Sequence, residues 1–228
     1  MTSNLTLESV RTRYQQELVF AGDGVRLAGQ IDYPVSPTRS QMFPLIFVLH
    51  HAGCEAHDGY QAFADLGLDA GYAVFRWDKR GTGHSGASGR GSTTQDAVNA
   101  YEIALEQPHV DRRRVVILAQ DAGAGLLGSS FGLFARVQLP HGVILATNTL
   151  NGDEALAIES RLLVVMGQND WHPWQQYGKQ VCDVHNQAYQ HGASYYVAPY
   201  ANRMLVDPRT ESLHYGVQNV ILDWLRAL

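Results

Sequence analysis

The sequence predicts one α/β domain with a mostly parallel sheet of about eight strands and helices on both faces. From residue 44 onward, apolar runs of strand length alternate with segments of helical periodicity. This alternation is typical of strand–helix units in a parallel sheet, whose strands are buried on both sides. The 228 residues, 45% of them hydrophobic, suit a single domain with a sizeable core.

The chain begins with a predicted hairpin, which adds antiparallel strands to one edge of the sheet. Two alternating stretches, 16–20 and 25–33, flank Ala21–Gly24, and the Gly-Asp-Gly sequence of this turn is typical of a tight hairpin. Residues 1–13 are predicted to be a poorly structured arm of the single domain 1–228.

The remaining predicted strands and helices alternate along the chain. The strands cover residues 44–50, 72–78, 115–120, 143–147, 162–167 and 195–198. The helices cover residues 58–70, 93–106, 122–136, 171–191 and 211–228. Gly71 is expected to end the first helix and Thr93 to cap the second. About fourteen residues separate Thr147 from Leu162, too few for a folded lid, so no cap domain is expected.

Composition and charge exclude several classes of function. The net charge is −5, and the one dense basic run is Arg112–Arg114. Because this run comes just before an apolar strand, we expect it to form a solvated loop. No nucleic-acid interface is therefore predicted. No apolar run approaches the ~20 residues of a membrane span, and no signal-peptide core begins the chain, so we expect a cytoplasmic protein. Cys54 and Cys182 lie far apart, and no ligand spacing indicates a metal or another cofactor.

Polar motifs follow the predicted strands, at the edge of the sheet where ligands bind in α/β proteins. In chain order they are His50-His51-Ala52-Gly53, Asp78-Lys79-Arg80-Gly81-Thr82-Gly83-His84-Ser85-Gly86, Gln120-Asp121-Ala122-Gly123, Gly167-Gln168-Asn169-Asp170 and Ala201-Asn202-Arg203-Met204. This series resembles the lidless α/β-hydrolases, specifically the dienelactone-hydrolase-like and acyl-peptidase-like esterases. Those proteins carry a His-Gly turn, an Asp-x-Arg-Gly-x-Gly-x-Ser run, a small-x-Ser-x-small elbow, Gly-x-x-Asp and Asn-His at the same places. The resemblance covers nearly the whole chain from about residue 16.

The resemblance implies a catalytic triad, but two of its three positions are changed. Asp121 stands at the centre of the elbow in place of serine, and Arg203 stands in place of histidine. Asp170 fills the acid position as in the family. Because arginine keeps its proton at working pH, Asp121 and Arg203 are predicted to cooperate by charge, as a buried or half-buried ion pair. The start of the following helix stabilises a negative charge by roughly 0.3–1 kcal/mol.

The resemblance also implies an oxyanion hole and a surrounding pocket. The Ala122 N–H would form one half of the hole and the Ala52–Cys54 turn, with Gly53, the other half. Residues expected to line the pocket are His50, His51, His172 and Trp171. For His50 and His51 an equal alternative is that the ring does not line the pocket but is hydrogen-bonded to backbone groups at the end of a strand. His172 is a candidate replacement base, with a surface histidine as the alternative. Trp77, Trp171 and Trp174 either form an aromatic wall or serve packing.

Three functions are compatible with these residues. The first is a degenerate hydrolase that lacks serine-hydrolase activity and binds a small molecule or a partner protein. The second is an active hydrolase whose nucleophile is Asp121, as in epoxide hydrolases and haloalkane dehalogenases, or a weak esterase. The aspartate mechanism requires His172, His50 or His51 to reach Asp121. The third is a non-catalytic interaction scaffold. The sequence determines neither the identity of the ligand nor the oligomeric state, for which a homodimer is one possibility.

Overall fold

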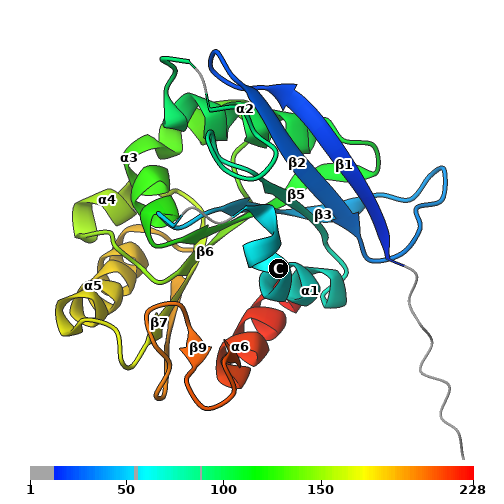
Figure 1. Cartoon of the computed structure of the whole chain (residues 1–228). Coiled ribbons are helices and arrows are strands. Elements are labelled where there is room, and N and C mark those ends of the chain that lie inside the picture. Colours follow the sequence, from blue (N-terminus) through cyan, green and yellow to red (C-terminus); the bar gives the residue numbers. More distant parts are fainter. Residues whose placement is uncertain (1–12, 54–55, 88) are drawn as a thin grey trace, which may run out of the picture.

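The structure is a computed structural model that describes residues 13–53, 56–87 and 89–228, apart from the side chains of residues 172 and 173 (Figure 1). Its centre is an eight-stranded sheet with the order β1-β2-β4-β3-β5-β6-β7-β8. The strands are β1 Tyr14–Ala21, β2 Arg26–Tyr33, β3 Phe43–Leu49, β4 Ala73–Trp77, β5 Val110–Gln120, β6 Gly142–Ala146, β7 Arg161–Gly167 and β8 Ala193–Ala198. The pairs β1–β2 and β2–β4 are antiparallel, and the other neighbours are parallel. The predicted fold class is confirmed.

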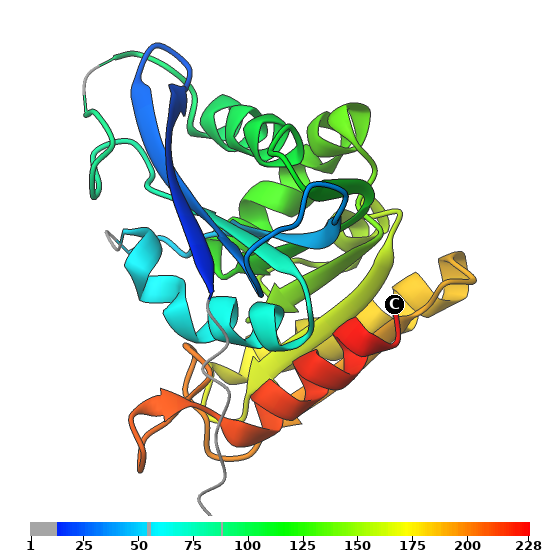
Figure 2. The same cartoon turned by 90° about the vertical axis from the view of Figure 1, so that its right-hand side faces the viewer.

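Helices cover both faces of this sheet, as predicted. They are α1 Gln61–Asp69, α2 Thr93–Leu105, α3 Ala122–Val137, α4 Gly152–Leu156, α5 His172–Ala188 and α6 Tyr215–Arg226, and a 3-10 turn, η1 His57–Tyr60, precedes α1. The apolar sides of α1 and α6 pack on one face, whereas those of α2, α3 and α5 pack on the other. Figures 1 and 2 show these two layers with the sheet between them.

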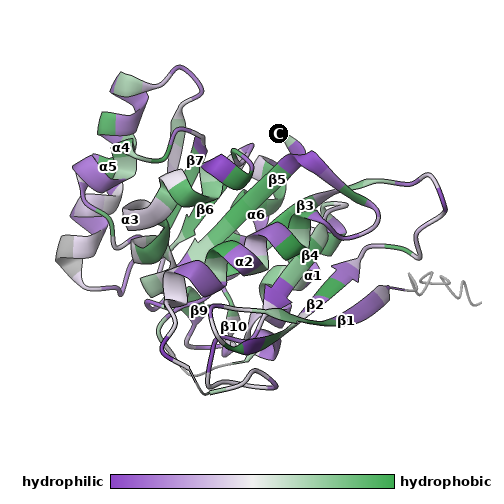
Figure 3. Cartoon of the chain, turned by 90° about the horizontal axis from the view of Figure 1, so that it is seen from above, coloured by the Kyte–Doolittle hydropathy of each residue, from purple (hydrophilic) through white to green (hydrophobic). Residues whose placement is uncertain are grey.

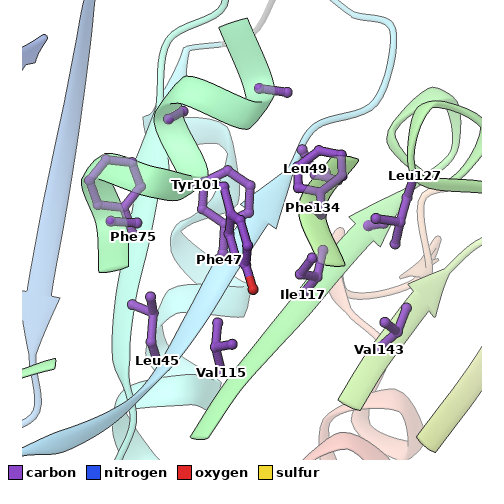
Figure 4. Packing of buried hydrophobic residues seen from close by; sticks show 14 of the residues in the cluster. Leu45, Phe47, Leu49, Phe75, Tyr101, Val115, Ile117, Leu127, Phe134 and Val143 are labelled. Atoms are coloured by element: carbon purple, nitrogen blue, oxygen red, sulfur yellow. The ribbon is translucent and has the colours of Figure 1, made fainter. Parts of the chain in front are cut away.

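The core lies in the two helix–sheet interfaces. Along β3, Leu45, Phe47 and Leu49 join the cluster under α2 and α3, while Ile46 and Val48 join the cluster under α1 and α6. Figure 4 shows the first of these sets beside Phe75, Tyr101 and Phe134. Because successive side chains of a strand point to opposite faces, a strand buried on both sides must be apolar throughout. Figure 3 shows this directly, since the central strands are mostly hydrophobic.

The hairpin forms one edge of the sheet, as predicted. β1 and β2 pair in register from Tyr14 with Tyr33 to Ala21 with Arg26. At the turn, Gly24 has φ +70°, a conformation that glycine adopts without steric cost. Of the predicted N-terminal arm, residues 1–12 lie outside the described residues, and Arg13 forms an ion pair with Asp65 on α1.

Two local predictions are wrong for reasons of hydrogen bonding. Arg112–Arg114 lies within β5, not in a loop, because this strand already begins at Val110, which pairs with Phe43 of β3. The three arginines are exposed within that strand. The cap of α2 is Ser92, whose hydroxyl accepts from the Gln95 N–H at 3.3 Å, and α2 itself begins at Thr93.

Three short elements were not predicted: one helix between β6 and β7, and two strands just before the last helix. The segment between β6 and β7 contains α4, which Asn151 and Glu154 stabilise through a capping box. This five-residue helix is far smaller than a lid. The last helix begins at Tyr215, not at residue 211, because Val206–Asp207 (β9) pairs with Ser212–Leu213 (β10) just before it. Among the helices of the described chain, none combines the length and apolarity needed to cross a membrane.

Candidate functional site

Asp121 occupies a sharp turn between β5 and α3. Its backbone has φ 51° and ψ −111°, a strained combination for a residue with a side chain that costs on the order of 1–3 kcal/mol. The turn brings the first residues of α3 against the end of β3. A Cβ atom on Gly123 would lie only 2.4 Å from the carbonyl oxygen of Leu49. Small residues are therefore needed beside Asp121, as the elbow pattern in the sequence indicates.

The structure brings Asp121 and Arg203 together, although they lie 82 positions apart in the chain. The Nη2 group of Arg203 donates to Oδ1 of Asp121 in a charged hydrogen bond. The Asp121 side chain is 19% exposed and that of Arg203 38% exposed, so the pair is half-buried. Among the described side chains, Arg203 is the one ion-pair partner of Asp121.

The loop after β8 holds Arg203 in place through both its backbone and its side chain. The Asn202 carboxamide oxygen accepts from the N–H groups of Met204 and Val206, at 2.9 and 3.0 Å. The Thr147 hydroxyl, just beyond β6, donates to the Arg203 carbonyl. The guanidinium carbon also lies 5.8 Å from the ring centre of Trp174 on α5, within cation–π range. These contacts orient the guanidinium toward the end of β5.

Asp170, which follows β7, is the third charged residue of the site. Its Oδ1 atom accepts from the Trp171 N–H at 2.7 Å and lies 3.7 Å from Nη1 of Arg203. Its Oδ2 atom is buried and has no hydrogen-bond partner in the described part of the chain. Burial raises the pKa of Asp170, and the neighbouring Asp121 charge adds to this effect, although the Trp171 N–H and Arg203 oppose it.

One of the predicted oxyanion-hole donors, the Gly53 N–H, is already engaged. Ala122 begins α3 and is exposed. The Gly53 N–H donates to Nδ1 of His51 at 2.8 Å, within its own turn. Lys79 fixes that turn, because its ammonium group donates to the carbonyls of His51 and Gly53 at 2.6 and 3.0 Å. Ala52 is exposed on the same turn, and Cys54 lies outside the described residues.

His50 is buried beside the elbow and makes no ion pair with Asp121. Its ring contacts Tyr60 and Trp77 edge-on, with 5.1 Å between ring centres in each pair. Burial lowers the pKa of His50 to about 3, and the nearby Lys79 charge contributes, so the imidazole is neutral at physiological pH. His51 is half-buried; its Nδ1 atom accepts from the Gly53 N–H, and its ring centre lies 6.0 Å from that of Tyr60.

The tryptophans divide between packing and surface roles. Trp77 is buried and donates its indole N–H to the Val48 carbonyl at 3.1 Å, so it serves packing. Trp171 is 64% exposed, and its ring contacts Trp174 at 5.8 Å between centres, which forms an aromatic rim beside Arg203. The side chain of His172, proposed from the sequence as a pocket residue or substitute base, lies outside the described part of the structure.

A buried histidine–aspartate pair, His57 and Asp78, was not predicted from the sequence. Asp78, after β4, accepts from the His57 N–H at 2.8 Å, from His57 Nδ1 at 2.7 Å and from the His84 N–H at 2.7 Å. Burial alone would raise the pKa of Asp78, but these hydrogen bonds outweigh it and lower the pKa. A Cβ on Gly83 would lie 2.2 Å from the carboxylate, so the Gly-x-Gly spacing after Asp78 is its sequence signal. His57 has no such signal. The pair ties η1 to the loop after β4.

The described residues contain no group of three or more histidine, cysteine, aspartate or glutamate side chains placed to hold a metal ion. The charged groups at the elbow are Asp121, which is hydrogen-bonded to Arg203, and Asp170, whose Oδ1 atom lies 3.7 Å from Nη1 of Arg203. A neutral imidazole lies nearby in His50.

Comparisons with known proteins identify the fold. No protein-family model matches the chain, and no curated protein matches its sequence. A predicted CIB-like hydrolase from Thermoplasma acidophilum aligns with a TM-score of 0.69 at 18% identity, over 95% of this chain and 100% of that one. A bacterial heroin esterase aligns with a TM-score of 0.70 at 12% identity, over 94% of this chain and 84% of that one. A hyperthermophilic esterase from the archaeon Pyrobaculum calidifontis aligns with a TM-score of 0.69 at 12% identity, over 94% and 85%. This chain therefore has the α/β-hydrolase fold and is structurally similar to esterases.

Proposed function

We propose that this protein has a degenerate catalytic triad, lacks serine-hydrolase activity and binds a small molecule beside Asp121 and Arg203. One observation carries the proposal: the Arg203 guanidinium is hydrogen-bonded to the Asp121 carboxylate. In the esterases that this sequence resembles, serine and histidine occupy these two positions. A serine–histidine pair works by proton transfer, whereas a guanidinium remains protonated and cannot accept a proton.

The same contact disfavours Asp121 as a nucleophile. One carboxylate oxygen is engaged by Arg203, and the positive charge of Arg203 lowers the tendency of the carboxylate to attack carbon. An ester formed on Asp121 would then need a general base to activate water. Arg203 cannot supply that base. The His51 ring bonds to Gly53, and the buried His50 ring packs against Tyr60 and Trp77.

A small ligand is favoured because the site keeps accessible recognition groups. The Arg203 side chain is 38% exposed despite its ion pair, and a guanidinium has five N–H donors. Trp171 and Trp174 add an aromatic rim next to it. A ligand could therefore take hydrogen bonds from Arg203 and pack against the indoles.

Ester hydrolysis tests the proposal directly. We expect turnover of p-nitrophenyl acetate and butyrate by the wild-type protein to equal that of Asp121→Ala and the buffer background. The double variant Asp121→Ser/Arg203→His should gain turnover, since it restores a nucleophile and a base next to Asp170. The matched control is Asp121→Ser/Arg209→His, in which the new histidine replaces an arginine that pairs with Asp207 instead. Wild-type turnover that disappears in Asp121→Ala would overturn the proposal.

A further inference from the structure

Asp121 and Arg203 keep hydrogen-bonding groups that their mutual contact leaves unused. The contact joins Nη2 of Arg203 to Oδ1 of Asp121. Within the described chain, Nη1 and Nε of Arg203 and Oδ2 of Asp121 make no hydrogen bond, and the Asp121 side chain does not cap α3. Because these atoms belong to the two groups that the contact joins, a free carboxylate acceptor lies next to free guanidinium donors.

These unused groups are open to solvent. The Arg203 side chain is 38% exposed and the Asp121 side chain 19% exposed. Some polar atoms of the described residues are buried without a hydrogen bond, such as Oδ2 of Asp170, but none of them belongs to Asp121 or Arg203. A ligand can therefore reach Oδ2 of Asp121 and the two free nitrogens of Arg203 from the surface.

The charges of the site favour a ligand group without net charge. Asp121 and Arg203 neutralise each other, and the side chain of Asp170 is only 1% exposed, so it presents no surface to a ligand. An anion bound to Arg203 would lie beside the Asp121 carboxylate, and a cation bound to Asp121 would lie beside the Arg203 guanidinium. A neutral group with an acceptor and a donor side by side meets both residues without such repulsion.

An exposed indole stands at the edge of the ion pair. Trp171 directly follows Asp170 and is 64% exposed. Its ring contacts that of Trp174, and the Trp174 ring centre lies 5.8 Å from the guanidinium carbon of Arg203. Aromatic side chains stack well against other flat groups. A flat ligand held by Arg203 and Asp121 can therefore also pack against Trp171.

We propose that Asp121 and Arg203 together bind a flat amide group whose C=O and N–H lie on the same side, such as a lactam or a primary carboxamide. The amide oxygen accepts from the free N–H groups of Arg203, and the amide N–H donates to Oδ2 of Asp121. Trp171 packs against the plane that carries the amide. This inference rests on the proposed ligand-binding function and extends it to the chemical class of the ligand.

Ring compounds of similar size test this arrangement on the full chain. In 2-pyridone the C=O and N–H groups are adjacent, in 4-pyridone they lie at opposite ends of the ring, and in N-methyl-2-pyridone the donor is blocked. Binding is followed by ¹H–¹⁵N NMR at the indole groups of Trp171 and Trp174. We expect 2-pyridone to bind at least about tenfold more tightly than the other two, because each of those can bond only one of the two partners. Benzoate and benzamidinium should also bind at least about tenfold more weakly than 2-pyridone, because each meets a like charge.

A change of preference in one variant separates recognition from damage to the fold. Arg203→Met leaves the Asp121 carboxylate without its counter-charge. We expect this variant to bind 2-pyridone about tenfold more weakly and benzamidinium about tenfold more tightly than the wild type, and a merely misfolded site would not gain affinity. The matched control is Arg209→Met, which removes an arginine that pairs with Asp207 and should keep the wild-type preferences.

A second pair of variants tests the packing against Trp171. Trp171→Ala should weaken 2-pyridone binding about tenfold, as expected for the loss of a stacking contact. Tyr215→Ala removes another exposed aromatic side chain and should leave the binding unchanged. Equal effects of the two variants would overturn the assigned role of Trp171.

Equal binding of 2-pyridone and 4-pyridone would overturn the inference, as would unchanged 2-pyridone binding in Arg203→Met. Tighter binding of either ion by the wild-type protein, or no binding of any probe, would also overturn it. The ester assay separates the two proposals. Wild-type ester turnover together with a preference for 2-pyridone would remove the proposed function and leave the amide site, whereas an inert protein that binds benzoate best would remove the amide inference alone.

Discussion

At the scale of single residues, one guanidinium faces two carboxylates. Arg203 bonds to Asp121 and lies 3.7 Å from Asp170, whose second oxygen is buried without a partner among the described groups. The positive charge is thus shared unequally, and Asp121 receives the closer contact. The raised pKa of Asp170 follows from this arrangement, because burial penalises a second negative charge that Arg203 compensates only in part.

Asp170→Asn should therefore stabilise the protein more at pH 7 than at pH 4. The pKa of Asp170 is higher in the folded protein than in the unfolded chain, so the folded state holds its proton more tightly. Ionisation then costs the folded state free energy as the pH rises from the unfolded pKa to the folded pKa, and that cost persists above it. Asparagine cannot ionise and avoids the cost. Urea unfolding of both proteins from pH 4 to pH 7 measures the difference, with Asp223→Asn on the exposed side of α6 as control. A difference that stays constant over this range would contradict the prediction.

A double-mutant cycle should show that Asp121 and Arg203 are coupled. We expect a coupling free energy of about 1 kcal/mol between Asp121→Asn and Arg203→Met, because the pair is half-buried and charge-assisted. The Lys179–Asp183 pair on α5 is the control, since both of its side chains are mostly exposed. Its coupling should be about 0.3–0.5 kcal/mol. Chemical denaturation of the single and double variants gives both values, and equal coupling in the two pairs would show that Arg203 does not specifically stabilise Asp121.

At the scale of elements, the site depends on how closely α3 approaches β3. Gly123 lets the first turn of α3 contact the backbone at the end of β3, with Leu49 and His50 oxygens 2.4 and 2.8 Å from where a Cβ would stand. The same approach holds Asp121 in its strained turn. One contact between a helix and a strand therefore shapes the elbow.

Gly123→Ala and Gly132→Ala should have opposite effects on stability, although both glycines lie in α3. At Gly123 the new methyl group would overlap backbone oxygens, so we expect a loss of about 1–3 kcal/mol. At Gly132 a Cβ meets nothing within 4 Å, so alanine should stabilise the helix by about 0.5–1 kcal/mol. Thermal and urea unfolding measure both changes. A neutral Gly123→Ala would mean that α3 can move away from β3 at little cost.

At the scale of the whole molecule, the parallel strand order assembles the site. Asp121 follows β5, Asp170 follows β7, and Arg203 lies in the loop after β8. Since β5, β6, β7 and β8 are parallel neighbours, their carboxyl ends meet at one edge of the sheet. Residues separated by up to 82 positions thus come into contact there.

The sequence by itself determined the class of fold and the places of Asp121, Asp170 and Arg203. The periodicity of apolar residues in a short segment indicates whether that segment forms a strand or a helix, and the ends of the strands follow from this pattern. Only the tertiary structure decided what depends on contacts between distant segments. Pairing with β3 extends β5 through Arg112–Arg114, and a hydrogen bond connects His57 to Asp78. The tertiary structure also buries His50 without a hydrogen-bond partner among the described residues. Pairing and burial are properties of packed neighbours, which periodicity along one chain does not encode.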